Sequence, residues 1–130
     1  MIKKAFQLTV FVKDQEEAKA FYTEKLGFVI HHDEEFSPGW RYVTVAPQKS
    51  CETMLELVIA ETPEQEGLVG RQAAGQVLIM FHTDNIEEDY RELQKRGVKF
   101  LGKPQPVPGG KGVAFEDLYG NHLDMFEPTE

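Results

Sequence analysis

The chain has a single cysteine and no long apolar run. Because Cys51 stands alone, no internal disulfide can form, which is typical of proteins in a reducing cytoplasm. No apolar stretch approaches the roughly 18 residues that a transmembrane helix needs, and residues 1–5 lead directly into a predicted strand, not into an export signal. We therefore predict a soluble, cytoplasmic protein with no membrane partner.

Positive charge is also scarce. Lys and Arg number 14 against 22 Asp and Glu, which gives a formal net charge of −8 at pH 7. This charge repels phosphates, and the basic residues are scattered without forming a basic face, so we predict no nucleic-acid partner. The excess of acid favours cationic ligands or serves solubility alone. No Walker or dinucleotide motif is present.

The segment from residue 6 to residue 28 contains the clearest structural signals. Residues 6–12 alternate between an apolar and a mixed face, which is the period of a strand. Asp14 then stands where a helix N-cap is expected, with Glu17 three residues later as in a capping box. An amphipathic pattern follows and stops at Gly27. The segment predicts a strand, a helix and the start of a second strand.

The same pattern returns about halfway along the chain. Four residues lie 70 positions after residues of the first segment, namely Phe81, Asp84, Glu87 and Gly97 after Phe11, Asp14, Glu17 and Gly27. Because the order of predicted elements repeats along with the residues, we interpret the chain as a tandem duplication. The alternative is two ordinary βα units within an α+β domain.

The predicted fold is α+β, with two tandem βαβββ modules in a single domain, residues 1–130. Module one covers 1–61, a connector with room for a short helical turn covers 62–74, and module two covers 75–130. Residues 34–39 are predicted to be a turn, and residues 103–110 a loop. The later strands are expected at 29–33, 40–46, 53–60, 76–81, 98–101, 111–116 and 121–126.

Three polar residues interrupt otherwise apolar strands. Glu56 and Asp124 are carboxylates among apolar neighbours, and Gln7 is the polar member of the first strand's mixed face. Burying an unpaired carboxylate costs several kcal/mol, so such a residue faces a wet concavity, has a partner, or lies on the solvent side of an edge strand. Glu56 and Asp124 are therefore the candidate catalytic residues.

Aromatic residues and one histidine are candidates for contacting a ligand. Phe11, Trp40 and Tyr42 offer flat walls for a planar or cationic molecule, although core packing is the better explanation for each of them taken singly. His122 lies two residues before Asp124 and so shares its strand face. With Gln7, these four residues form the predicted ligand-binding set.

Several motifs resemble the vicinal oxygen chelate superfamily, which includes glyoxalase I, bleomycin-resistance proteins, fosfomycin-resistance proteins and extradiol dioxygenases. The resemblance covers nearly the whole chain and rests on residues 7–14, 21–22, 26–28, 55–57, 97–100, 111–115 and 117–121. It implies two βαβββ modules that curl into half-open cups around one ligand cavity, commonly in a homodimer. Such a fold binds a small molecule between the modules.

The resemblance also implies four metal-ligand positions. Gln7, Glu56 and Asp124 match the first, second and fourth positions, whereas the third falls on Leu78, which cannot bind a metal. We therefore expect no cofactor, although a divalent ion on the other three residues stays an alternative. The two-histidine triad of an extradiol dioxygenase is missing from these positions.

These observations lead to one leading hypothesis of function and two alternatives. The leading hypothesis is a bleomycin-resistance-like protein that binds a small molecule without a required metal. The first alternative is a metal-dependent lyase or isomerase of glyoxalase type. In the second alternative, Glu56 or Asp124 acts as a general base without a metal.

Overall fold

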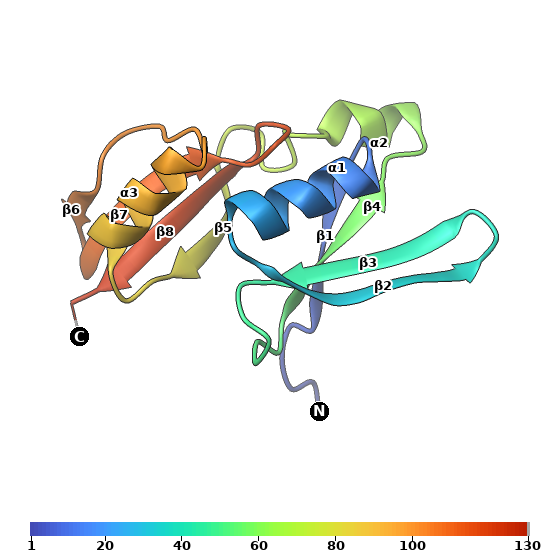
Figure 1. Cartoon of the computed structure of the whole chain (residues 1–130), viewed down its shortest axis with the longest axis horizontal. Helices are drawn as coiled ribbons and strands as arrows, with labels where there is room; N and C mark the ends of the chain where they lie inside the picture. Colours follow the sequence, from blue (N-terminus) through green and yellow to red (C-terminus); the bar gives the residue numbers. More distant parts are fainter. Residues whose placement is uncertain (130) are drawn as a thin grey trace. The chain divides into compact units, whose positions relative to one another are not determined.

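Figure 1 shows the computed structural model, which describes residues 1–129. The chain divides into two compact units, Met1–Val69 and Gly70–Glu130. Unit one comprises seven elements: β1 (Gln7–Val12), α1 (Gln15–Ala20), the π-helical turn η1 (Phe21–Lys25), β2 (Val29–Ser37), β3 (Trp40–Ala46), β4 (Met54–Ile59) and α2 (Pro63–Leu68). Unit two comprises five: β5 (Val77–His82), α3 (Ile86–Lys95), β6 (Gln105–Val107), β7 (Gly110–Glu116) and β8 (His122–Pro128).

Each unit contains one four-stranded mixed sheet. The strand orders are β1-β4-β3-β2 in unit one and β5-β8-β7-β6 in unit two. The two outer pairs β1–β4 and β5–β8 are parallel, and the other neighbours are antiparallel. The predicted α+β class and the two tandem βαβββ modules are confirmed.

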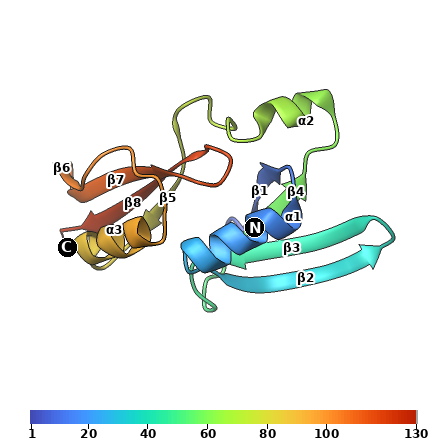
Figure 2. The same cartoon turned by 45° about the horizontal axis from the view of Figure 1, so that its top comes forward.

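A helix covers one face of each sheet (Figures 1 and 2). In unit one the apolar side chains on one face of β1, β3 and β4 pack against α1, whose Ala18 is fully buried. In unit two the buried face of β7 and β8 packs with Ile86 and Leu93 of α3. The core side chains below 10% exposure include Val10, Val12, Val43, Val45 and Leu57 in unit one, and Val113, Phe115, Leu123 and Met125 in unit two. On the opposite face of the sheet in unit one, the side chains of Gln7, Tyr42 and Glu56 are only partly buried, and we call this partly exposed face of each sheet its open face.

The repeat of 70 positions extends to whole elements. β5 begins and ends 70 residues after β1, and β7 begins and ends 70 residues after β3. Gly27 and Gly97 follow the first helices of the two units with φ angles of 77° and 92°. Only glycine adopts this left-handed conformation at little cost, so the two glycines end the helices in the same way.

Three local predictions were wrong. β2 continues through Ser37, so most of the predicted turn at 34–39 is strand and the reversal is confined to Pro38 and Gly39. The predicted strand at 98–101 contributes only an isolated bridge from Phe100 to Phe115, and the second strand of unit two is instead β6 at 105–107, inside the predicted loop 103–110. Pro106 is tolerated there because β6 is an edge strand, where a missing N–H costs no ladder bond.

The cap of α3 lies one residue beyond Asp84, which is the position that the 70-residue repeat gives it. The side chain of Asp14 accepts the Glu17 N–H at 2.9 Å, as expected, but in α3 the cap is Asn85 and not Asp84. Asn85 accepts the N–H of Glu88 at 3.2 Å. Asparagine and aspartate cap helices about equally well. The sequence alone therefore does not distinguish Asp84 from Asn85 as the N-cap of α3.

The predicted connector contains the short helix α2. Thr62 caps it by accepting the N–H of Gln65 at 3.1 Å, and Pro63 occupies the first turn, where its missing N–H is harmless. No helix in the described part of the chain has the length and apolar character needed to cross a bilayer. The module boundaries at 61 and 75 stay predictions.

An ion-pair network connects the β2–β3 hairpin to α1. Arg41 donates through Nε and Nη2 to both carboxylate oxygens of Asp33, at 2.7 and 2.8 Å, and Nη2 also reaches Glu16 at 2.6 Å. Lys19 of α1 binds Asp33 at 2.8 Å. Because Arg41 lies between Trp40 and Tyr42 in β3, the network fixes the strand that carries both aromatic rings.

We expect Asp33→Asn to lower the free energy of unfolding by about 1 kcal/mol at neutral pH, the upper range for a partly exposed ion pair. The hydrogen bonds from Arg41 and Lys19 hold the pKa of Asp33 well below its usual range. Its stabilisation is therefore complete above the ordinary carboxyl pKa and is lost as the pH falls through the folded-state pKa. Urea unfolding across the acid range should show the difference from wild type shrinking on acidification. Glu34→Gln, on the exposed neighbouring carboxylate of β2, is the control, and a difference that grew towards acid pH would contradict the assignment.

Candidate functional site

Three predicted residues meet on the open face of unit one. Gln7 lies on β1, Glu56 on β4 and Tyr42 on β3. The Gln7 amide nitrogen donates to Oε1 of Glu56 at 2.8 Å, and the Tyr42 hydroxyl donates to the Gln7 amide oxygen. The result is a continuous row, Tyr42–Gln7–Glu56, across three strands. Both ends of the Gln7 side chain are engaged, so its orientation is fixed.

The row has a distinct electrostatic character. Burial raises the pKa of Glu56 above its ordinary value. The pKa of Tyr42 is raised first by burial and second by the negative charge of Glu56. Tyr42 therefore keeps its proton and remains a donor to Gln7, while Glu56 is a carboxyl that gains a proton more readily than an exposed glutamate.

Aromatic rings continue this face toward the tip of the β2–β3 hairpin. Phe36 stacks on Tyr42 with centroids 5.3 Å apart and an interplanar angle of 25°, and Trp40 meets Phe36 edge-on at 5.3 Å. His32 lies 5.5 Å from the Tyr42 ring. Phe36 and Trp40 are 53% and 52% exposed. A stacked ring system thus stands partly open to solvent beside the polar row.

Sequence reasoning missed Phe36 and His32 as members of this face. Phe36 lies in the segment 34–39 that the sequence predicts to be a turn, and His32 is not among the predicted ligand-binding residues. Extending the strand to residue 37 and continuing its alternation from His32 would have placed Phe36 on the same face. His32 pairs with Thr44, whose hydroxyl it meets at 3.2 Å.

Phe11 and the two candidates of unit two lie elsewhere on open faces. Phe11 pairs in register with Val58 of β4, on the parity of Gln7, and is half-buried. Asp124 lines a hollow of about 270 Å³, and burial raises its pKa, partly offset by the N–H groups of Met125 and Val113. His122 borders a separate hollow and lies 4.0 Å from the Glu116 carboxylate.

The structure therefore brings four predicted residues together: Gln7, Trp40, Tyr42 and Glu56. It places Asp124 and His122 in unit two, on β8. That all seven candidate residues, Phe11 included, serve a single site stays a prediction, as does a cavity between the modules.

The donor atoms within each unit do not fit a resident metal ion. Within either unit, the described residues include no group of three or more His, Cys, Asp or Glu side chains placed to hold one. The Gln7 amide is committed to Tyr42 and Glu56, and the position matching the third ligand is Leu78, a half-buried apolar side chain of β5. A divalent ion needs several oxygen or nitrogen ligands converging on one point.

Comparison with known proteins identifies the family. The model of the Glyoxalase/Bleomycin resistance protein/Dioxygenase superfamily matches residues 4–125, so the chain belongs to this superfamily, the vicinal oxygen chelate superfamily. It is 36% identical over 128 residues to an uncharacterized protein of Shewanella frigidimarina, covering 98% of this chain and 95% of that protein. It is 37% identical over 121 residues to YetH of Bacillus subtilis, covering 93% and 95%.

Among solved structures, TnmS3, an antibiotic binding protein from Streptomyces sp. CB03234, has the same fold. The TM-score is 0.83 at 33% sequence identity, with 98% of each chain covered. The predicted family and the glyoxalase/bleomycin-resistance-like fold are confirmed.

Proposed function

We propose that the protein binds a small, flat organic molecule on the open face of unit one and needs no metal ion to do so. The observation that carries this proposal is the partly exposed ring stack of Tyr42, Phe36 and Trp40. Large rings left half in solvent gain from covering by another flat surface, because stacking adds to the burial of apolar area. The name of TnmS3, an antibiotic binding protein, supports the same class of function.

In this proposal the polar row orients the ligand. Gln7 is held at both ends, so the second carboxylate oxygen of Glu56 stays in a fixed place for a ligand's donor group. Because hydrogen bonds within the protein hold these side chains in place, less conformational entropy is lost when a ligand binds. The rings provide the contact area and Glu56 the polar specificity.

The metal-dependent lyase or isomerase stays the alternative. It requires an ion that polarises a carbonyl, with a carboxylate that moves a proton. Calorimetric titration of nickel, zinc and manganese into protein dialysed against a chelator separates the two functions. We expect no binding near stoichiometry and no change on Glu56→Ala; tight binding that Glu56→Ala abolishes would favour the lyase.

A metal-free enzyme with Glu56 as general base is favoured by one observation, the pKa of Glu56 raised by burial. Such a shift moves a carboxyl toward the working range of a base at neutral pH. Turnover of a bound carbonyl compound, lost in Glu56→Gln while binding persists, would identify this activity. The homodimer and the cytoplasmic location stay predictions.

We expect flat aromatic compounds to raise the melting temperature of the chelator-treated protein. A compound present at ten times its Kd adds about 1.4 kcal/mol to the free energy of unfolding, enough to raise Tm by several degrees. Differential scanning fluorimetry with a panel of naphthalene, quinoline and acridine derivatives measures this shift. Cyclohexyl analogues of the same compounds are the control. A broad panel with no shift, or equal shifts from the cyclohexyl compounds, would contradict the proposal.

A further inference from the structure

The strands β3 and β4 separate beside the proposed site. Their antiparallel pairing is limited to Thr44 with Glu56 and Val45 with Leu55. Past this point the Gln15 side chain stands between the two strands: its amide nitrogen donates to the carbonyl of Arg41 at 2.9 Å and to that of Leu57 at 2.8 Å. Gln15 is only 8% exposed, so this one side chain satisfies two backbone carbonyls where the ladder ends.

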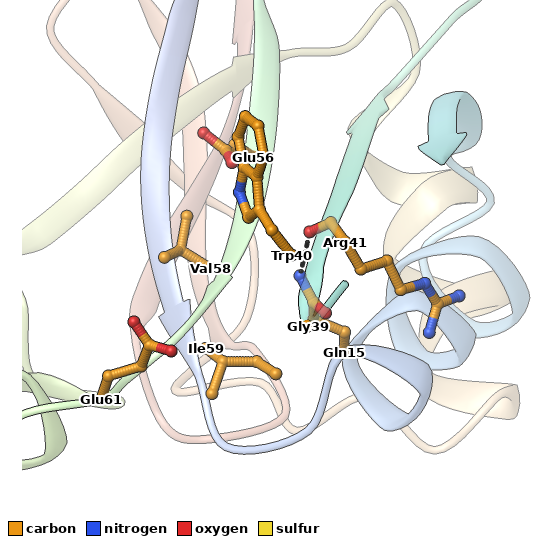
Figure 3. A pocket seen from close by; sticks show the side chains of 8 residues that line it. All are labelled: Gln15, Gly39, Trp40, Arg41, Glu56, Val58, Ile59 and Glu61. Atoms are coloured by element: carbon orange, nitrogen blue, oxygen red, sulfur yellow. Dashed lines mark hydrogen bonds between the residues drawn. The ribbon is translucent and has the colours of Figure 1, made fainter. Parts of the chain in front are cut away.

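The separation leaves a hollow of about 110 Å³, shown in Figure 3. Its lining combines an indole ring, two apolar side chains and two carboxylates, contributed by Trp40, Val58, Ile59, Glu56 and Glu61 together with Gln15, Gly39 and Arg41. We call this hollow the β3–β4 slot. Glu56 belongs both to the slot and to the polar row, so the slot adjoins the ring stack.

The charges of the slot are negative and not neutralised. In Figure 3 the Arg41 guanidinium points away from the hollow, where Asp33 and Glu16 bind it. Among the described residues, the Glu56 carboxylate accepts a hydrogen bond from the neutral Gln7 amide alone, and neither Glu56 nor Glu61 forms an ion pair. The slot therefore presents two carboxylates and an indole face to whatever enters it.

We propose that the β3–β4 slot is the subsite for a positively charged group, an ammonium or guanidinium attached to the flat ligand. An indole face attracts a cation, and a partly desolvated carboxylate strengthens that attraction. A hollow of about 110 Å³ has room for a small cationic head. This inference rests on the proposed function, because the flat part of the ligand lies on the ring stack while its cationic head enters the slot.

Three naphthalene probes with different heads test the inference. They are 1-naphthylmethylamine, protonated at neutral pH, 1-naphthalenemethanol, neutral and of the same length, and 1-naphthoate, an anion. We expect calorimetry to show that the ammonium probe binds at least about tenfold more tightly than the alcohol, and that the anion binds most weakly.

Two isosteric variants distinguish the effect of a slot carboxylate from the effect of the protein's net charge. Glu61→Gln removes a slot carboxylate, whereas Glu64→Gln removes the same charge from the exposed first turn of α2. We expect Glu61→Gln to reduce the preference for ammonium over alcohol about threefold and Glu64→Gln to leave it unchanged. Equal effects of the two variants, or a preference that survives both Glu61→Gln and Glu56→Gln, would assign the selectivity to net charge and overturn the inference.

The outcomes also separate this inference from the proposed function. If all three probes bind to the ring stack with equal affinity, the slot selects no charge and only the inference fails. If the anion binds most tightly, the inference is again overturned while binding to the ring stack stands. If no probe binds, the proposed function itself fails.

Discussion

Replacing Gly70 with alanine should lower the free energy of unfolding by about 3 kcal/mol, from backbone strain together with steric overlap. Gly70 has a φ of +76°, which a residue with a side chain adopts at a cost. A Cβ there would lie 1.9 Å from the carbonyl oxygen of Tyr119 and 2.7 Å from its carbonyl carbon. Both are backbone atoms, so no side-chain rotation relieves the overlap, and either the turn before β8 or the start of unit two must move.

Hydrogen bonds hold that turn in place, so moving it lowers the stability of the folded protein. Oδ1 of the buried Asp117 accepts the backbone N–H groups of Tyr119, Gly120 and Asn121 at 3.1, 3.1 and 2.9 Å. The Asn121 carboxamide in turn accepts the N–H of Gln72 at 3.3 Å. Moving Tyr119 would stretch these bonds and displace the first residue of β8, His122.

Gly67→Ala is the matched control for Gly70→Ala. Gly67 lies inside α2, and a Cβ there would meet nothing within 4 Å. Since alanine is the better helix former, we expect this variant to be neutral or to gain up to about 1 kcal/mol. Urea unfolding followed by circular dichroism compares the two. A Gly70→Ala protein as stable as Gly67→Ala would show that the close approach to Tyr119 is not a feature of the folded protein.

The second large effect concerns binding. We expect Trp40→Leu to weaken binding of 1-naphthylmethylamine about 30-fold, equivalent to about 2 kcal/mol, because it removes ring stacking and a cation–π contact together. Leucine keeps an apolar surface at the site, so the loss reports on the ring itself. Isothermal titration calorimetry is the suitable measurement, since the variant no longer contains tryptophan.

Two further variants define how the Trp40 result is interpreted. Trp40→Phe keeps a ring with a weaker attraction for cations, so its affinity should fall between those of wild type and Trp40→Leu. Phe6→Leu removes another exposed aromatic side chain of unit one, 59% exposed but outside the ring stack, and should leave binding unchanged. An affinity that drops as much in Phe6→Leu as in Trp40→Leu would mean that the probe adheres to exposed rings in general.

Much of the fold followed from periodicity in the sequence. The alternation in residues 6–12 and the capping signals at Asp14 and Gly27 located β1 and the first helix, and the 70-residue spacing then located their counterparts in unit two. These signals act within a few residues, so a single sequence contains them. The strand at 105–107 was missed because its residues include Pro106, which is allowed only at a sheet edge, and the edge is defined by the finished sheet.

The candidate site was predictable only in part, for a related reason. Glu56 and Gln7 were noticeable because each is polar within an apolar strand, and the structure joins them by a hydrogen bond. The Tyr42 hydroxyl bond and the Gln15 bridge depend instead on strand order and on where β3 and β4 separate. Such contacts link residues far apart in sequence, and no local sequence pattern predicts them.

The central claim is that the open face of unit one binds a flat ligand without a metal. Trp40 is the only tryptophan, so its indole N–H gives a single, unambiguous signal in proton–nitrogen correlation spectra of isotope-labelled protein. Titration of chelator-treated protein with 1-naphthylmethylamine should shift this signal saturably, together with the amides of Tyr42 and Glu56. The claim would be contradicted if these signals stayed in place throughout the titration, or if they moved only after a divalent metal was added.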